Sequence, residues 1–565
     1  MEVLTRVMPE HLIVSSLASP NNHISSPDVC PKDSNAGSTS PRSASPAELI
    51  GLLGLLLITF VIRWVFLAGP VGSDDTRYMD AAWKLAHGQP PGVLDHAYVR
   101  GAYIVWLAAW SWAGAPGSAL VVSQSVVGVL LVLAIYRLAQ RLTEDWRAAL
   151  VAGFCWIMFP VELTYGGIVF PDELAALLAL IAGGAAITGL RAPSGSGYVS
   201  IVTAGVFTGL AISVKEPYLL LPIIFGFWAL WQIRPVRPAL LRVALIGLVA
   251  SCTFALEYPF FRLWTGDWLY RHRALHTVYG AGGLVTREVP NWYPGLSLYY
   301  LRDVLFNPNE SGLFGWLLLI AALRVLRTVK ESRFIVCWSL GFFAFLQFGS
   351  TTLTRYQPLP MQPRYVHPFV ILLFIPFGLW IVALSRSVHL RRLGTALFVG
   401  GIVVQGISIA EIASARGLYF DTFPRAVEQT LSMQARGAIG PVAVLKPVHD
   451  RLPPDLRQRI RSWPKIDVLT GLPAVELQQL QRARIALLMP NGVDRLQSPT
   501  VNYAELERWL LNNARAAVVE DGRTFLDRFW LSTRIALLSR RATSVPVGHL
   551  YIFDHNRITF KEPHT

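Results

Sequence analysis

The feature that most constrains this sequence is a series of apolar runs, each long enough to cross a membrane as one helix. A helix rises about 1.5 Å per residue, so about 20 apolar residues span the hydrocarbon core of a bilayer. About eleven runs meet this length. The sequence predicts transmembrane helices near 49–69, 117–139, 148–165, 168–190, 198–214, 217–233, 240–261, 312–328, 334–350, 365–385 and 393–413.

The composition agrees with lipid as the main solvent. Of the 565 residues, 53% are hydrophobic and only 15% are charged, whereas soluble chains carry about 25% charged residues. The 18 tryptophans suit membrane–water interfaces. A soluble protein with a large core would show amphipathic stripes rather than long runs. We therefore expect an α-helical polytopic membrane protein.

Arginine and lysine orient the predicted helices, because cytoplasmic loops carry the excess of positive charge. The opposite short loops hold only Lys215, Arg355 and Arg364. The Arg-rich loops, predicted to be cytoplasmic, hold Arg137, Arg141, Arg147, Arg191, Arg234, Arg237, Arg242, Arg324, Arg327, Lys330, Arg333, Arg386, Arg391 and Arg392. The net charge of +14 therefore indicates topology, and no nucleic-acid partner is expected.

Three segments outside the runs complete the predicted organisation. Residues 1–47 are polar and are expected to form a disordered cytoplasmic tail. The loops 70–116 and 262–311 are expected outside, and the short aromatic run 101–113 within the first suits a helix lying in the interface. Residues 414–565 alternate short apolar strands with helical patterns, which predicts a small extracytoplasmic α/β domain. The predicted strands are 441–446, 466–471, 483–490, 516–521 and 549–554.

Paired carboxylates follow the first apolar run directly. Asp74 and Asp75 are adjacent, and Arg77 and Tyr78 come next. A carboxylate at a membrane surface can act as general base toward an acceptor hydroxyl. Aspartate is also a good helix N-cap. One residue can cap the helix while the other reacts, so both interpretations stay open.

Two further ionisable pairs lie at predicted outer ends of helices. Asp172 and Glu173 open the run 168–190, where the helix dipole favours acidic side chains. Lys215 lies in a short outer turn, against the orientation rule. It therefore requires an anionic partner, either a substrate phosphate or a carboxylate such as Asp172 or the adjacent Glu216.

Three arginines are placed where their charge needs an explanation. Arg364, with Tyr365, begins the run 365–385; it can clamp a lipid phosphate or anchor the helix in the headgroups. Arg100, ahead of the interfacial run, is another cationic candidate. Arg63 lies inside the first run, where a charge is costly, so it is expected to face the bundle or to snorkel outward.

No metal site is predicted from the sequence. His272 and His276 have the i,i+4 spacing of a metal pair, but no carboxylate shares their segment. The four cysteines form neither a disulfide framework nor a ligand pattern. The cofactor is left as unknown.

At Asp74–Tyr78 the sequence resembles the GT-C superfamily of glycosyltransferases that use polyprenyl-phosphate sugars. The resemblance is strongest to the branch of protein O-mannosyltransferases and the lipid A aminoarabinose transferase. There an Asp-Glu pair, often followed by Thr-Arg-Tyr, opens the first extracytoplasmic loop. Later features of the branch match Asp172, Lys215 and Arg364–Tyr365 in order, over about residues 48–413.

Three departures accompany this resemblance. The pair is Asp-Asp, Arg100–Gly101 stands where Lys-Pro commonly begins the second interfacial helix, and Glu216 follows Lys215 where Gly is frequent. They concern the donor and the phosphate contacts more than the reaction class. The superfamily's members differ over whether a divalent metal is needed, so metal dependence stays open.

The resemblance implies a membrane glycosyltransferase, expected in a bacterial inner membrane. It would move a sugar from a polyprenyl-phosphate donor to a hydroxyl of a glycan, lipid or protein acceptor outside, with inversion. Asp74 and Asp75 are the implied catalytic residues, Asp74 as base. Implied substrate-binding residues are Arg77, Tyr78, Arg100, Asp172, Lys215, Arg364 and Tyr365. Alternatives are a transporter or lipid flippase, although no internal repeat is evident, and a glycan polymerase or ligase with a lipid-linked donor.

Overall fold

The structure of the protein is a computed structural model. It describes residues 45–65, 74–91, 94–114, 120–193, 196–279, 298–307, 311, 314–329, 331–350, 359 and 362–386, scattered residues between 391 and 436, and five strands between 442 and 552. The predicted disordered tail lies outside the described residues, apart from its last three positions. So do the middle of the loop 262–311 and most of the run 393–413.

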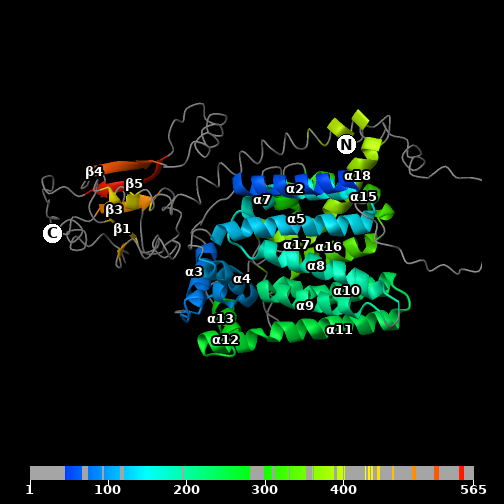
Figure 1. The fold of residues 1–565 in the computed structure, drawn as a ribbon, viewed down its shortest axis with the longest axis horizontal. Helices are drawn as coiled ribbons and strands as arrows, with labels where there is room; N and C mark the ends of the chain where they lie inside the picture. The colour runs from blue at the N-terminus through cyan, green and yellow to red at the C-terminus, as the bar shows by residue number, and fades with distance from the viewer. Residues whose placement is uncertain are drawn as a thin grey trace, which may run out of the picture.

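The described fold is mostly helical. Figure 1 shows long helices running side by side, with α3, α4, α12 and α13 gathered at one end of them. The helices of ten or more residues are α2 (Pro46–Val65), α3 (Asp74–Ala86), α4 (Gly101–Trp112), α5 (Val122–Thr143), α6 (Trp146–Ile157), α8 (Asp172–Arg191), α9 (Tyr198–Val214), α10 (Leu221–Gln232), α11 (Val236–Ala255), α13 (Tyr270–Tyr279), α15 (Phe314–Val325), α16 (Ser332–Phe348) and α18 (Phe374–Arg386).

Short helical segments connect the long helices and position several polar residues. They are η1 (His96–Val99), α7 (Pro160–Tyr165), η3 (Glu216–Leu220), α12 (Glu257–Thr265), η5 (Tyr300–Leu305), η6 (Leu326–Thr328), η7 (Pro363–Val366), α17 (His367–Val370) and η8 (Ile371–Leu373). Several of the predicted spans contain such segments. The run 148–165 breaks between α6 and α7, where Pro160 occupies the first turn of a new helix. The run 365–385 contains the turn η8.

Five helical stretches among the described residues are long and apolar enough to cross a membrane. They are Pro46–Trp64, Val122–Thr143, Asp172–Arg191, Val236–Thr265 and Pro363–Arg386, and Trp146–Ile157, Tyr198–Val214 and Ser332–Phe348 are shorter apolar helices. The protein is therefore an integral membrane protein. The count of eleven spans stays a prediction.

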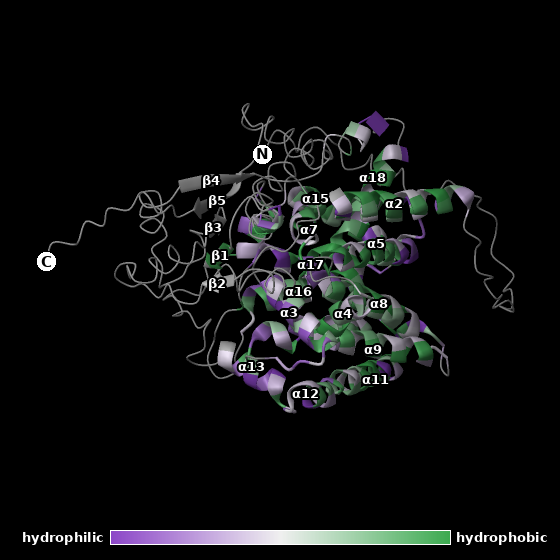
Figure 2. Cartoon of the chain, turned by 60° about the vertical axis from the view of Figure 1, so that its left-hand side comes forward, coloured by the Kyte–Doolittle hydropathy of each residue, from purple (hydrophilic) through white to green (hydrophobic). Residues whose placement is uncertain are grey.

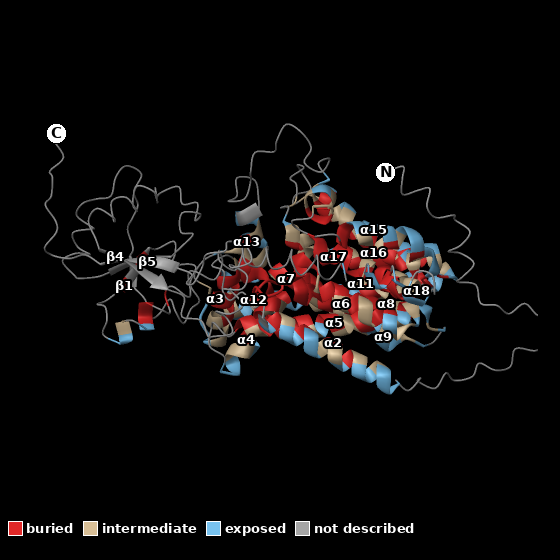
Figure 3. Cartoon of the chain, turned by 90° about the horizontal axis from the view of Figure 1, so that it is seen from above, coloured by how far each residue is buried: buried red, intermediate tan, exposed pale blue. Residues whose placement is uncertain are grey.

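The exposed face of the first of these helices, α2, indicates that the surrounding medium is apolar. Ile50, Leu57 and Trp64 are 70%, 64% and 58% exposed, respectively. Figure 2 shows α2 as predominantly hydrophobic, and Figure 3 shows exposed segments along it while the centre of the bundle is buried. An apolar face of this size would be unfavourable in water, so it is expected to contact lipid.

Close helix packing in the bundle depends on two glycines. Gly205 and Gly209 lie four residues apart on α9, the spacing that lets membrane helices approach closely. A Cβ at Gly205 would lie 2.5 Å from Cβ of Val249, and one at Gly209 would lie 2.6 Å from the carbonyl oxygen of Ala250. Both neighbours belong to α11, so any side chain at these glycines would push α9 and α11 apart.

The C-terminal region contributes five strands in one sheet of order β2-β1-β3-β5-β4. They are β1 (Val442–Leu445), β2 (Arg461–Trp463), β3 (Ala486–Pro490), β4 (Arg515–Glu520) and β5 (Pro546–Ile552). β1 pairs in parallel with β2 and β3, and β5 pairs antiparallel with β3 and β4. Four strands coincide with predicted ones, but the predicted strand 466–471 lies outside the described residues. A separate α/β domain over 414–565 stays a prediction.

Candidate functional site

Four charged side chains from four elements meet near α3, and we call them the Asp74 cluster. Asp74 begins α3, Asp172 begins α8, Lys215 directly follows α9, and Arg364 lies in η7. Each lies at or next to a helix end, where the chain enters or leaves the bundle. The fold therefore brings together residues that are up to 290 positions apart, from Asp74 to Arg364.

Arg364 is the centre of the Asp74 cluster. Its Nη2 lies 3.6 Å from Oδ2 of Asp74, and its Nε lies 4.0 Å from Oδ2 of Asp172. Lys215 donates a hydrogen bond to Asp172. Carboxylates and cations thus alternate along one row of contacts, from Asp74 through Arg364 and Asp172 to Lys215. The sequence left Asp172 and Glu216 open as carboxylate partners of Lys215. In the structure, Lys215 pairs with Asp172.

Burial separates Asp74 from the other members of its cluster. Its side chain is 30% exposed, whereas those of Asp172, Lys215 and Arg364 are 5–8% exposed. Burial lowers the pKa of Lys215 to about 8, although Asp172 opposes this shift. Arg364 Nε is buried and lacks a hydrogen-bond partner among the described residues. An unpaired buried donor is costly, and an anionic oxygen would satisfy it.

Aromatic rings line the cationic side of the cluster. Nζ of Lys215 lies 3.9 Å from the centroid of the Tyr365 ring, and Cζ of Arg364 lies 3.9 Å from that of Phe170. Cations are stabilised over ring faces in desolvated sites. Tyr365, predicted from the sequence as a binding residue, is therefore in contact with the Asp74 cluster.

His96 adds a second positive contact to Asp74. Its Nε2 lies 3.4 Å from Oδ1 of Asp74, and its Nδ1 lies 3.1 Å from Oδ1 of Asp95. Burial alone would lower the pKa of His96, but the two carboxylates outweigh it and raise that pKa to about 9. Burial would likewise raise the pKa of Asp74, yet the contacts with His96, Arg364 and Arg77 lower it. Asp74 is therefore ionised at neutral pH.

The other predicted residues of the first loop divide into buried and exposed ones. Asp75 and Tyr78 are buried, at 0% and 2% exposure. Arg77 is 51% exposed at its side chain and pairs with Asp95, its Nη1 lying 2.7 Å from Oδ2. Of the adjacent aspartates, only Asp74 is accessible to a ligand.

Arg100 belongs to a neighbouring polar group rather than to the Asp74 cluster. It donates to the carbonyl of Val214 at 2.9 Å and lies 3.5 Å from Glu216. Arg271 pairs with Glu216 at 2.8 Å and with Glu257 at 2.6 Å. Glu216 therefore forms ion pairs with both arginines. These contacts connect the start of α4, η3 and α13 beside Lys215.

A second set of charges lies wholly inside the bundle, and we call it the Arg63 cluster. Arg63 of α2 donates to Glu162 of α7 and lies 2.6 Å from Glu173 of α8. His367 of α17 lies 3.4 Å from Glu162. All four side chains are at most 3% exposed. The expectation that Arg63 faces the bundle is confirmed.

Glycines make room for this buried guanidinium. A Cβ at Gly166 would lie 1.5 Å from Nη1 of Arg63, and one at Gly128 would lie 2.6 Å from its Nε. The Arg63 cluster also adjoins the Asp74 cluster along the chain, because Glu173 follows Asp172 and His367 is three residues after Arg364.

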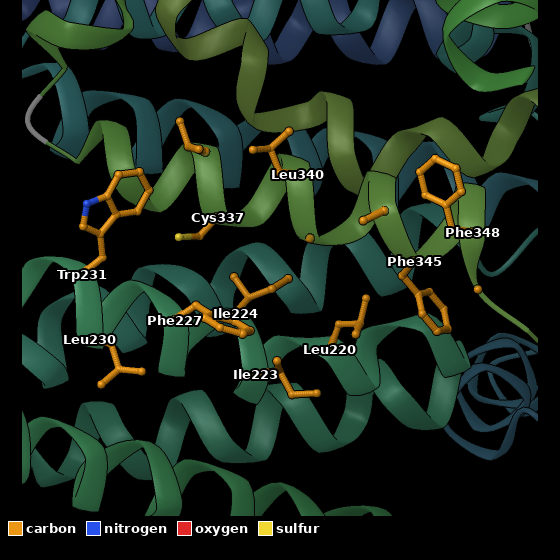
Figure 4. A pocket seen from close by; sticks show the side chains of 14 residues that line it. Leu220, Ile223, Ile224, Phe227, Leu230, Trp231, Cys337, Leu340, Phe345 and Phe348 are labelled. Carbon is orange, nitrogen blue, oxygen red and sulfur yellow. The ribbon is translucent and has the colours of Figure 1, made fainter. Parts of the chain in front are cut away.

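An apolar groove runs between α10 and α16 (Figure 4). Its cavity volume is about 840 Å³. The groove follows the length of α10. Leu220, just before the start of α10, belongs to η3, the turn that follows Lys215, and Trp231 lies near the C-terminal end of α10. The groove therefore begins five residues from the cationic side of the Asp74 cluster.

No group of three or more metal-binding side chains occurs in the part of the chain that the structure describes. His272 and His276 lie on α13 and are exposed. Among the described residues, no third metal-binding side chain forms a group with these two histidines. The cofactor stays unassigned.

Sequence reasoning missed His96, Glu162 and Arg271. His96 and Arg271 have no periodic pattern around them, and only long-range folding reveals their partners. Glu162 did carry a signal, because it is an acidic residue inside the apolar run 148–165. Such a residue is expected to be paired or functional.

Residues 95–256 match the family described as dolichyl-phosphate-mannose-protein mannosyltransferase. This segment contains Arg100, Asp172 and Lys215. No curated protein matches the sequence of the chain.

Solved structures with weak likeness to this chain include an archaeal oligosaccharyltransferase and ArnT. The apo oligosaccharyltransferase of Archaeoglobus fulgidus has a TM-score of 0.48 at 13% identity, covering 78% of this chain and 69% of that one. ArnT from Cupriavidus metallidurans bound to undecaprenyl phosphate has a TM-score of 0.43 at 13% identity, covering 92% of this chain and 100% of that one.

Proposed function

We propose that the chain is a membrane glycosyltransferase of the GT-C superfamily and that it transfers one sugar from a polyprenyl phosphate to an acceptor hydroxyl; the family match over residues 95–256 supports this proposal. The observation that carries the proposal is the Asp74 cluster. It combines one accessible carboxylate with two buried cations, one of which has an unpaired donor. Transfer from a phosphate carrier requires both kinds of group.

In the proposed reaction Asp74 accepts the proton of the acceptor hydroxyl as that oxygen attacks the anomeric carbon. The bond from this carbon to the phosphate oxygen breaks on the opposite face of the sugar, so the configuration inverts. General bases of this kind contribute typically about 10²–10⁴ in rate. Because its neighbours lower its pKa, the Asp74 side chain is ionised at neutral pH and binds the transferred proton only weakly.

The leaving polyprenyl phosphate gains negative charge, which Lys215 and Arg364 are placed to stabilise. Lys215 is a point charge and Arg364 offers a planar set of donors, including the unpaired Nε. Preorganised cations in a site with little water stabilise such charge strongly. Arg100 and Tyr365 complete the proposed binding surface, and Asp172 holds Lys215 in place.

The donor's lipid tail needs an apolar surface that reaches the phosphate site. The groove between α10 and α16 offers one, because it starts in η3 and runs along two apolar helices. Its walls carry Leu220, Phe227 and Leu340 and no charged residue (Figure 4). We place the first prenyl units there.

The same proposal includes the orientation of the chain. The N-terminus is placed in the cytoplasm of a bacterial cell, with the Asp74 cluster and the C-terminal region on the opposite side of the inner membrane. Reporter fusions near residue 45 and after residue 430 are expected to report opposite sides. Reports from the same side would contradict the predicted odd number of spans.

The reaction is tested with purified protein and a panel of polyprenyl-phosphate sugars, using cell-envelope glycans, lipids and proteins as acceptors. The expected result is a glycosylated product together with free polyprenyl phosphate. A second set of reactions uses glycans linked to polyprenyl pyrophosphate. Glycan transfer from these donors with release of polyprenyl pyrophosphate, and no transfer from the monophosphate donors, would instead indicate a polymerase or ligase. Movement of labelled lipid across a vesicle membrane without product would support a flippase.

A further inference from the structure

A second groove, between α5, α8 and α9, extends away from the Asp74 cluster. Its cavity volume is about 480 Å³. On α8 its lining extends from Leu177 to Thr188, whereas the Asp74 cluster is at Asp172. With 1.5 Å per residue, Thr188 lies about 24 Å along the helix from Asp172. The groove therefore opens toward the other leaflet.

The walls of this groove change from apolar to polar along its length. Leu130, Leu133 and Leu177 line the part nearer the middle of the helices. Arg137 and Arg141 of α5 line the part nearer the helix end, together with hydroxyls of α8 and α9. The two arginines are four residues apart, so they project from the same face of α5.

Small residues of α8 create the space beneath Arg141. Gly184 and Ala185 both line the groove. A Cβ at Gly184 would meet only Nη1 of Arg141, at 3.7 Å. The guanidinium therefore lies over a glycine, and the room beside it is open rather than filled by a neighbouring helix.

Neither arginine forms an ion pair with a carboxylate among the described residues. Arg137 contacts neutral groups: its Nη1 lies 3.4 Å from Oε1 of Gln140, and its Cζ lies 5.8 Å from the centroid of the Tyr136 ring. Glu48, which contacts α5, accepts instead from Tyr136 and Gln140. By contrast, Arg386 pairs with Asp145 at 2.6 Å. Two adjacent cations without acidic partners are suited to an external anion.

We propose that this groove binds one anionic phospholipid in the leaflet opposite the Asp74 cluster. The lipid phosphate lies between Arg137 and Arg141, and an acyl chain lies along the apolar wall past Gly184. Basic pockets between membrane helices bind anionic headgroups in this way. A free phosphate would use only the arginines, whereas a phospholipid also uses the apolar wall.

The test is native mass spectrometry of the full-length protein in detergent with added phosphatidylglycerol or phosphatidylcholine of the same acyl chains. We expect phosphatidylglycerol to bind about 30-fold more tightly, since each of the two arginines near the surface contributes about 1 kcal/mol, or about fivefold. The double variant R137Q/R141Q is expected to lose this preference. Arg147→Gln, at the same end of the bundle but outside the groove, is the matched control and keeps it.

A second variant tests the apolar wall with both charges in place. Gly184→Leu projects a side chain into the groove, and we expect it to weaken phosphatidylglycerol binding at least tenfold. Millimolar inorganic phosphate is expected not to displace the lipid. Equal binding of the two lipids by the wild type would overturn the proposal. So would full binding by Gly184→Leu or displacement by phosphate, which would leave the arginines as topology determinants or a simple anion site.

Discussion

The Asp74 cluster and the Arg63 cluster are built from the same kinds of side chain but differ in access. Each contains two carboxylates and an arginine held between helices. Asp74 is 30% exposed, whereas no member of the Arg63 cluster exceeds 3%. A ligand can therefore reach the first but not the second. This difference supports the proposal that chemistry takes place at the Asp74 cluster and that the Arg63 cluster positions helices.

The two clusters are also connected, which explains why a membrane protein would keep four buried polar groups. Asp172 and Glu173 are adjacent at the start of α8, and Arg364 and His367 lie one turn apart. Fixing Glu173 and His367 in the bundle thus fixes the backbone that presents Asp172 and Arg364. Buried ion pairs rarely add stability compared with apolar packing, but they impose a defined arrangement.

The largest expected effect is on stability, from Arg63→Met. This change leaves Glu162 and Glu173 buried without their cation, and breaking a buried pair costs about 3–5 kcal/mol. We expect the thermal midpoint of unfolding in detergent, measured by tryptophan fluorescence, to be strongly lowered. Arg77→Met is the matched control, because the half-exposed Arg77–Asp95 pair should contribute about 0–1 kcal/mol. Similar midpoints for the two variants would remove the distinction between the clusters.

A smaller effect is expected on donor binding from Lys215→Met. A hydrogen bond to a charged group contributes about 1.5–3 kcal/mol, so the KM for the polyprenyl-phosphate donor should rise about 10- to 100-fold. The kcat should fall less, and the KM for the acceptor should change little. Lys84→Met, on α3 but outside the cluster, is expected to leave the donor KM near the wild-type value. An unchanged donor KM in Lys215→Met would show that Lys215 only neutralises Asp172.

The smallest predicted effect is a pH dependence that originates at His96. Its pKa is raised from the usual 6.5 to about 9 in the folded protein. Protonated His96 therefore stabilises the fold fully below about pH 6.5, and this contribution is lost as the pH rises through about 9. The difference in thermal midpoint between wild type and His96→Gln should follow that curve. A difference that is constant from pH 6 to pH 10 would argue against the contacts with Asp74 and Asp95.

Local patterns in the sequence were sufficient to predict the helices and part of the site. The apolar runs located α2, α5, α8 and α9 because lipid exposure requires continuous apolar residues. Asp172 and Arg364 were found because they open such runs, and both belong to the Asp74 cluster. The sequence did not show that Lys215 pairs with Asp172 rather than Glu216, since both partners lie at the same predicted membrane surface.

The rest of the site depends on contacts between distant segments. His96 reaches Asp74 across 22 positions, and nothing near it in the chain indicates this. The Arg63 cluster needed the break at Pro160, which places Glu162 on a separate short helix instead of in a continuous span. Arg77 was predicted as a site residue by its position in the motif and Arg100 as a cation ahead of the interfacial run, but they contact Asp95 and Glu216. Their part in substrate binding stays a prediction.

The central claim is that Asp74 carries the chemistry, and the turnover of Asp74→Asn tests it most directly. Initial rates would be measured with purified protein and a polyprenyl-phosphate sugar, with Asp80→Asn on the same helix as the matched control. We predict that Asp74→Asn keeps its thermal midpoint within a few degrees but loses about 10²–10⁴ in kcat, while Asp80→Asn stays active. Near wild-type turnover of a folded Asp74→Asn protein would contradict the assignment.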